Sequence, residues 1–374
     1  MKYVHIAGTN GKGSAAEYIW QIIMAAGEKC GCFTSPHLVS PTERFRANGK
    51  KIDVATLDAL LHEVEQKKLA VNDSLFAAYT AAALLWFERM GLSYAVLETG
   101  LGGRLDPTNM VTPEVSVLTP IGYDHIDLLG DTIGKIAAEK AGIIKPDVPV
   151  ISAWQLPEAE AVIRAEAERK RAPVHFVSTV NVLSASLDGQ TFEADGRQYY
   201  IRGIGEMQPE IAALAVLAAR VMGFGEDAIR EGQSRAVIPC RTQYIPGMPD
   251  ILLDGAHNGP AVKSLCRTLE RYFPDRKKIL LFACMKDKDY ADMAAQLAPR
   301  FEQVVVTSVS ASRGADTLVL KELFGAHTSC DVVDDAREAC EKAWEIVKAS
   351  GSLLVVCGSF YLAGAVLNFI NHSH

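Results

Sequence analysis

Short apolar runs alternate with amphipathic segments through the first part of the chain. The earliest run, Tyr3–Ala7, predicts a buried strand, and the segment 15–26 behind it predicts a helix that ends at Gly27. Later segments predict strands at 30–34, 94–97, 115–118, 148–152 and 174–177, and helices at 54–67, 74–90, 132–141, 158–170, 209–222 and 226–233. This alternation favours a mostly parallel, doubly wound α/β sheet.

The alternation begins again near Pro239. Strands are expected at 251–253, 279–282, 304–307, 331–333 and 353–356, each beside a helix. Residues 180–201 instead alternate in the manner of antiparallel strands. We therefore predict two α/β domains, one at residues 1–239 and a smaller one at residues 240–374.

The composition is that of a soluble globular protein. Of the 374 residues, 49% are hydrophobic and 22% are charged. The formal net charge of −7 argues against nucleic acid as the main partner. No apolar run reaches the roughly 18–20 residues of a membrane span, so no membrane partner is expected. The eight scattered cysteines read as reduced packing residues, which predicts a cytoplasmic protein.

A glycine-rich segment joins the first strand to the first helix: Tyr3-Val-His-Ile-Ala-Gly-Thr-Asn-Gly-Lys-Gly-Ser14. Glycines allow backbone N–H groups to close around phosphate oxygens, and the helix N-terminus adds partial positive charge. Lys12 can reach the β- and γ-phosphates, and Ser14 can reach them or their Mg²⁺. The nucleotide-binding residues expected here are Asn10, Gly11, Lys12, Gly13 and Ser14. The alternative is a glycine-rich turn without a ligand.

Polar side chains also follow the next strands. Ser35, Glu98 and His125 come after three successive candidate strands, so we expect them to converge near the γ-phosphate. Hard oxygen ligands suit Mg²⁺, and one imidazole among them is workable. These residues therefore form a candidate magnesium site.

Each candidate also has a structural interpretation. Ser35 precedes a proline and could start a turn. Glu98 could pair with Arg104, and His125 could be a structural histidine. Lys140, late in a predicted helix, would usually be a solvated charge that favours the helix dipole.

Several longer motifs point to one family. They are Ala7-Gly-Thr-Asn-Gly-Lys-Gly-Ser14, Thr34-Ser-Pro-His-Leu38, Glu98-Thr-Gly-Leu-Gly-Gly-Arg-Leu-Asp-Pro-Thr-Asn109, Gly122-Tyr-Asp-His125, Leu128-Leu-Gly-Asp-Thr132, Glu139-Lys-Ala-Gly-Ile-Ile-Lys-Pro146 and Asp254-Gly-Ala-His-Asn258. In this order they resemble the folylpolyglutamate synthase/dihydrofolate synthase family, which belongs to the ATP-dependent Mur-ligase superfamily. The resemblance extends through most of the chain.

The resemblance implies a P-loop-type, doubly wound ATP-binding domain, a smaller Rossmann-like domain and catalysis in the cleft between them. It implies a monomeric ligase whose substrates are ATP, L-glutamate and a folate or dihydropteroate. ATP phosphorylates the acceptor carboxylate, and the amine of glutamate then displaces phosphate to form an amide. Both dihydrofolate synthesis and lengthening of a glutamate tail fit this chemistry, and the sequence leaves the choice open.

The resemblance also implies roles for residues of the first domain. Lys12 and Ser14 hold phosphates. The expected Mg²⁺ ligands are Ser35, Glu98 and His125. Lys140 matches a lysine that is carbamylated in the family, which gives a carboxylate-like group for a second metal or the γ-phosphate.

In the second domain the resemblance assigns Arg241 to phosphate, Asp254 to the ribose and His257 to the incoming glutamate. The expected catalytic residues are Lys12, His125, Lys140 and His257. A monovalent cation is a further expected cofactor.

The chain departs from the family pattern in four places. It begins at the strand that precedes the glycine-rich loop Gly8–Ser14 (the phosphate loop), where members usually carry a further segment that helps shape the pterin side. Ala77 stands in place of a glutamate, Ile211 in place of an asparagine associated with adenine, and Cys240 in place of a glycine. Two alternatives therefore stay open: a ligase of the same mechanism for a non-folate carboxylic acid, and a non-catalytic nucleotide-binding paralogue.

Overall fold

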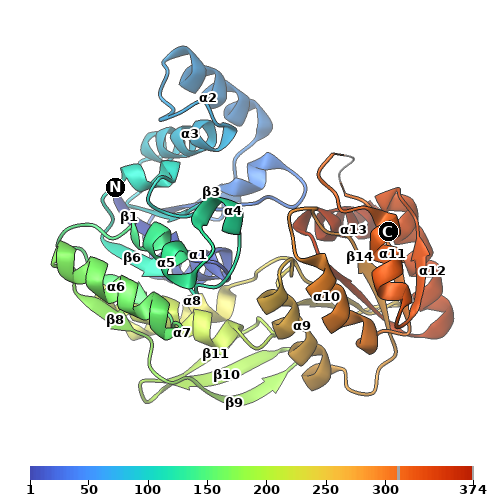
Figure 1. Cartoon of the computed structure of the whole chain (residues 1–374). Coiled ribbons are helices and arrows are strands. Elements are labelled where there is room, and N and C mark those ends of the chain that lie inside the picture. Colours follow the sequence, from blue (N-terminus) through green and yellow to red (C-terminus); the bar gives the residue numbers. More distant parts are fainter. Residues whose placement is uncertain (310–311, 373–374) are drawn as a thin grey trace. The chain divides into compact units, whose positions relative to one another are not determined.

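The computed structural model describes residues 1–309 and 312–372, and this part of the chain divides into two compact units (Figure 1). Unit 1 comprises Met1–Ser184, Gln190–Arg202 and Met207–Val237, and unit 2 comprises Ala185–Gly189, Gly203–Glu206 and Ile238–His374. None of the helices in the described residues is long and apolar enough to cross a bilayer. All eight cysteines lie in this described part and are free.

Unit 1 is built on a mostly parallel sheet with the strand order β4-β3-β2-β5-β1-β6-β7-β8. The strands are β1 (Lys2–Ala7), β2 (Cys30–Phe33), β3 (Phe45–Ala47), β4 (Lys50–Lys51), β5 (Tyr94–Glu98), β6 (Val115–Leu118), β7 (Val150–Ser152) and β8 (Val174–Phe176). Pairing is parallel from β2 to β8, while β3 and β4 add an antiparallel edge. The predicted doubly wound α/β fold is confirmed.

The helices of unit 1 pack in pairs and triples on this sheet (Figure 1). They are α1 (Lys12–Ala25), α2 (Val54–Gln66), α3 (Leu75–Arg89), α4 (Ile126–Leu129), α5 (Ile133–Ala141), α6 (Pro157–Lys170), α7 (Gln208–Val221) and α8 (Glu226–Arg235). Helix α1 packs against α7 and α8, α2 against α3, and α5 against α6. The sequence placed the start of α1 at Ala15, which is wrong, because the helix already begins at Lys12.

Unit 2 has its own sheet, with the order β12-β13-β17-β14-β15-β16. Its strands are β12 (Gln243–Ile245), β13 (Ile251–Leu253), β14 (Lys278–Phe282), β15 (Gln303–Val306), β16 (Ser329–Val332) and β17 (Leu353–Cys357), and its helices are α9 (Gly259–Tyr272), α10 (Tyr290–Leu297), α11 (Thr317–Gly325), α12 (Ala336–Ser350) and α13 (Phe360–His372). Pairing is parallel from β13 to β16, and β12 joins antiparallel. The predicted strands are present; β12, only three residues long, was missed.

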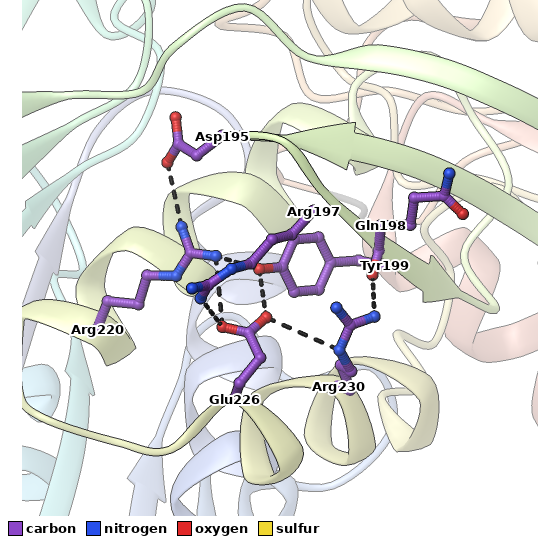
Figure 2. A network of polar contacts seen from close by, with 7 residues as sticks. All are labelled: Asp195, Arg197, Gln198, Tyr199, Arg220, Glu226 and Arg230. Atoms are coloured by element: carbon purple, nitrogen blue, oxygen red, sulfur yellow. Dashed lines mark hydrogen bonds and ion pairs between the residues drawn. The ribbon is translucent and has the colours of Figure 1, made fainter.

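A small separate sheet has the order β11-β10-β9. Its strands are β9 (Asn181–Ser186), β10 (Gly189–Ala194) and β11 (Arg197–Ile201). Figure 2 shows the polar network that ties β11 to α7 and α8. Glu226, in the first turn of α8, accepts hydrogen bonds from Tyr199 at 2.5 Å and from Arg197 at 2.6 Å. Arg220 of α7 joins the same group and also reaches Asp195 at 3.2 Å. This charged cluster fixes the small sheet on the helices of unit 1.

Because of this cluster, we expect the removal of one charge from α8 to lower the free energy of unfolding by different amounts at different positions. We expect Glu226→Gln to lower the free energy of unfolding by about 1–2 kcal/mol, because hydrogen bonds to a charged group are lost from three partners. The matched control is Glu231→Gln on the same helix, whose ion pair with Arg235 is about half exposed and should change stability by less than about 0.5 kcal/mol. Urea unfolding of both variants checks this. Equal losses would contradict the role given to Glu226.

Candidate active site around the phosphate loop

The glycine-rich segment leaves the carboxyl end of β1 and leads directly into α1. A Cβ added at Gly8 would lie 1.9 Å from Oγ1 of Thr119, so only glycine fits there. Gly11, with φ of +85°, is the N-cap of α1, and among the described residues no side chain caps this helix end. The first N–H groups of α1 are therefore available to an anion, which the helix dipole also favours.

The sheet topology places this segment where α/β proteins bind ligands. From β1 the chain passes to β2 on one side, and from the neighbouring β6 it passes to β7 on the other side, which makes a topological switch point. The loop after β6 is tied to the phosphate loop. The Thr9 N–H donates to the Pro120 carbonyl at 3.0 Å, and Oγ1 of Thr9 bonds both the N–H and the carbonyl of Gly122 at 3.0 Å.

Two lysine amines meet at the carbonyl of Gly8. Lys12 donates from Nζ to the carbonyls of Gly8 and Thr9 at 3.2 and 3.3 Å, and Lys140 donates from Nζ to Gly8 at 2.8 Å. Lys140 is only 4% exposed, so its interpretation as a solvated charge is wrong. Burial, together with the charge of Lys12, lowers the pKa of Lys140 to about 7. A large fraction of this amine is therefore neutral near physiological pH.

Ser35 and Glu98 lie in contact beside the start of α1. Glu98, the last residue of β5, is 3% exposed, and its Oε2 accepts the Ser35 N–H at 2.9 Å. A Cβ added at Gly13 would lie 3.5 Å from the same oxygen, so the carboxylate faces the first turn of α1. Arg104 pairs with Glu139, so the alternative pairing of Arg104 with Glu98 is wrong. A buried carboxylate and a hydroxyl at this place suit Mg²⁺.

His125 lies in the loop after β6 and opens α4. Its backbone has φ of +49°, which is uncommon for a residue other than glycine, and its Nε2 lies 3.9 Å from Oδ1 of Asp124. Within residues 1–309 and 312–372 no three His, Cys, Asp or Glu side chains cluster as a metal site. The expected ligand set does not conflict with this, because it combines a hydroxyl, one carboxylate and one imidazole. The roles of these residues stay predictions.

The remaining expected site residues belong to unit 2: Arg241 lies just before β12, and Asp254 and His257 follow β13. Asp254 accepts the N–H and the hydroxyl of Thr242 through Oδ2, both at 2.8 Å, and the Ala256 N–H through Oδ1 at 2.7 Å. Burial raises the pKa of Asp254, and the charge of Arg241 opposes that shift. Asp254 thus shapes its own loop, while its contact with ribose stays a prediction.

Phe360, which was not predicted as a site residue, lies beside both Arg241 and His257. The guanidinium carbon of Arg241 lies 4.5 Å from the centre of the Phe360 ring, and the His257 ring lies 5.7 Å from it. Nδ1 of His257 lies 2.7 Å from the carbonyl of Gly255 and donates to it. The roles of Arg241 and His257 also stay predictions.

Unit 1 also contains a buried chain of hydrogen bonds, from His5 through Thr108 to Asp106, that was not predicted from the sequence. Asp106 accepts the N–H groups of Gly100 and Leu101 at 2.8 and 2.9 Å, and the hydroxyl of Thr108 at 2.5 Å. Since that hydroxyl donates to Asp106, Nε2 of His5 must donate to it across 2.8 Å. Burial lowers the pKa of His5 to about 3, so the ring is neutral. His5 lies within the apolar run Tyr3–Ala7, which indicated only a buried strand. Asp106 lies within the motif Glu98–Asn109, in which it had been assigned no role.

A cavity of about 550 Å³ opens beside Ser35. Its wall includes the glycine loop from Gly100 to Gly103 and Asp106, with Phe76 and Leu128 as apolar contributors. A volume in this range is typical of small-molecule sites. The cavity, the Ser35–Glu98 pair and the phosphate loop are all parts of unit 1.

Comparison with known proteins identifies the family. The family model described as Mur ligase middle domain matches residues 6–199, and that described as Mur ligase, glutamate ligase domain matches residues 240–360. The chain is 34% identical to dihydrofolate synthase/folylpolyglutamate synthase of Bacillus subtilis, over 96% of this chain and 87% of the relative. It belongs to the folylpolyglutamate synthase/dihydrofolate synthase family. The Escherichia coli member is also 34% identical, over 98% of this chain and 86% of its own.

Solved structures of this family agree with the fold. Folylpolyglutamate synthase of Mycobacterium tuberculosis, complexed with ADP and AMPPCP, gives a TM-score of 0.91 at 32% identity and covers 98% of this chain and 90% of its own. FolC of E. coli, in complex with DHPP and ADP, gives 0.89 at 31% identity and covers 100% and 89%. The family and the Mur-ligase fold expected from the motifs are confirmed.

The buried lysine predicts a pH-dependent stability. Between its folded pKa of about 7 and its ordinary value of 10.5, the unfolded chain binds more protons at Lys140 than the folded chain does. The contribution of Lys140 to stability therefore rises with pH in this window. Relative to Lys140→Met, we expect the native protein to gain about 2 kcal/mol between pH 7 and pH 9.

Unfolding by urea in CO₂-free buffer measures this difference. The control is Lys135→Met on the same helix, since Lys135 is exposed and pairs with Asp131. Parallel pH profiles for the native protein and Lys140→Met would contradict the low pKa of Lys140.

Proposed function

We propose that this chain is an ATP- and Mg²⁺-dependent ligase that joins L-glutamate to the carboxylate of a folate or of dihydropteroate. The observation that carries the proposal is the meeting of Lys12 and Lys140 at the Gly8 carbonyl, beside the uncapped N-terminus of α1 and the Ser35–Glu98 pair. This arrangement places the charge of Lys12 and the positive end of the α1 dipole at the end of β1 and keeps an oxygen-rich group next to them.

The proposed chemistry explains that charge. An acceptor carboxylate and the γ-phosphate of ATP are both anions, and they must approach each other for phosphoryl transfer. Lys12 and the N–H groups of α1 would hold the phosphates and offset their repulsion. Ser35, Glu98 and His125 would hold Mg²⁺, which neutralises phosphate charge when bound.

The cavity beside Ser35 would hold the acceptor. Its apolar walls suit an aromatic body, and Asp106, held rigidly by the Gly100 and Leu101 N–H groups, offers a polar contact. An acid seated there would have its carboxylate next to Ser35 and the phosphate loop.

Two steps complete the reaction. An oxygen of the acceptor carboxylate attacks the γ-phosphorus, and ADP leaves. The neutral amine of glutamate then attacks the acyl carbon, phosphate leaves, and the amine loses its remaining extra proton. For these steps Arg241, Asp254 and His257 are the proposed contacts of unit 2 to phosphate, ribose and glutamate.

Lys140 would act in a modified form. Its neutral amine can add to CO₂, forming an N–C bond and losing one proton, and the product carries a negative charge. Near Lys12 that charge would be stabilised, since a repulsive pair becomes an attractive one. The monomeric state, a bound monovalent cation and a cytoplasmic location stay predictions.

Release of ADP tests the proposal. With Mg²⁺, ATP and L-glutamate, we expect release that depends on dihydropteroate, tetrahydrofolate or both, and a product heavier by one glutamyl unit. The mass of the product distinguishes synthesis of dihydrofolate from lengthening of a glutamate tail. Lys12→Ala should lower the rate at least about 100-fold, because a preorganised charge is lost, whereas Lys135→Ala, an exposed site, should not. If ATP binds but neither acceptor causes release of ADP, the result would favour a ligase that acts on another carboxylic acid.

A further inference from the structure

The cavity beside Ser35 contains both charged and apolar groups. Among the described residues that line it, Arg44 is the one with a positively charged side chain. The carboxylates in the wall belong to Asp106 and Glu139. Asp106 accepts N–H and hydroxyl donors from its own loop, and Glu139 pairs with Arg104. Arg44 is therefore the cationic group of this wall that the carboxylate of a ligand could contact.

Arg44 is held in a defined position. It ends the 3₁₀ helix η1 (Pro41–Arg44), and its carbonyl accepts the Thr34 N–H at 3.1 Å, directly before Ser35. Its Nε donates to Nδ1 of His37 at 2.9 Å, and its guanidinium carbon lies 5.5 Å from the centre of the Tyr79 ring. An arginine fixed by these contacts loses little further freedom when it binds a ligand.

The imidazole of His37 supports this orientation. Because Nε of Arg44 donates to Nδ1, that nitrogen carries no proton. The ring therefore accepts the guanidinium N–H through Nδ1 and holds Arg44 in this orientation.

The loop that carries Arg44 is also closed by hydrogen bonds. The carboxylate of Glu43 accepts the N–H groups of Leu38 at 2.7 Å and Ser40 at 3.0 Å, and Ser40 caps η1 in return. The segment between β2 and β3 is therefore a preorganised support for the guanidinium.

We propose that Arg44 binds the non-reacting α-carboxylate of a glutamyl acceptor and so decides whether the cavity accepts folates that already carry a glutamate. This rests on the function proposed above. Dihydropteroate has a single carboxylate, which must lie at Ser35 to react, whereas a folate monoglutamate has a second one. A planar guanidinium recognises a carboxylate through two parallel hydrogen bonds.

The test compares acceptors with and without the second carboxylate. We expect Arg44→Gln to raise KM for tetrahydrofolate about 10- to 100-fold. The KM for dihydropteroate and for ATP should change less than about threefold, because neither contact involves Arg44. Arg44→Lys, which keeps the charge but loses the planar guanidinium, should have a KM for tetrahydrofolate between those of the native protein and Arg44→Gln. The control Arg89→Gln removes an exposed arginine of α3 that pairs with Glu63 and should change neither KM.

A second measurement uses the native protein. A tetrahydrofolate whose α-carboxylate is replaced by an amide should show the raised KM with native enzyme and no further rise with Arg44→Gln. An equal loss for both acceptors, or an additive loss with the amide, would overturn the role of Arg44. A native enzyme that uses dihydropteroate but not tetrahydrofolate would overturn it too. Use of neither acceptor by the native enzyme would defeat the proposed function and this inference together.

Discussion

The carbonyl of Gly8 is the point on which the site depends. It accepts hydrogen bonds from Lys12 and Lys140, and one of these amines is almost fully buried. Two ammonium groups so close together repel each other, and burial adds the cost of lost hydration. The protein reduces both effects by lowering the pKa of Lys140 to about 7. A phosphate bound at the adjoining start of α1 would reduce them further, so binding of an anion and stability of the site are coupled.

The surrounding fold serves that constraint. Gly8 must lack a side chain because Thr119, directly after the neighbouring strand β6, crowds it, and Thr9 is hydrogen-bonded to the loop after β6. The parallel strands β1, β5 and β2 bring Glu98 and Ser35 to the same edge of the sheet. Ser35 in turn borders the cavity that Arg44 and Asp106 line. One edge of one sheet thus carries the phosphate loop, the candidate metal ligands and the candidate acceptor pocket.

Much of this was predictable because it depends on local sequence. The alternation of strands and helices predicted both sheets, and long motifs predicted the family. The start of α1 was misplaced because glycines at 11 and 13 read as loop, although the left-handed Gly11 is what allows the helix to begin at Lys12. The burial of Lys140 was not evident from the local pattern, since a lysine near a helix end is typically a solvated charge, whereas the folded chain buries this one.

Contacts between distant segments account for the rest. His5 and Thr108 are 103 positions apart and give no shared periodic signal, yet together they hold Asp106. Phe360 gathers Arg241 and His257 from more than a hundred positions away. Arg44 and His37 are close in sequence, but their bond depends on the η1 turn, which was not predicted.

In the proposed reaction, phosphate passes to the acceptor carboxylate before glutamate is joined. An acceptor whose reacting carboxylate is labelled with ¹⁸O, incubated with ATP, Mg²⁺ and L-glutamate, tests this order of events. The carboxylate oxygen that attacks the γ-phosphorus stays with phosphorus when the amide forms. We expect one ¹⁸O atom in the released inorganic phosphate. Unlabelled phosphate alongside a glutamylated product would contradict it.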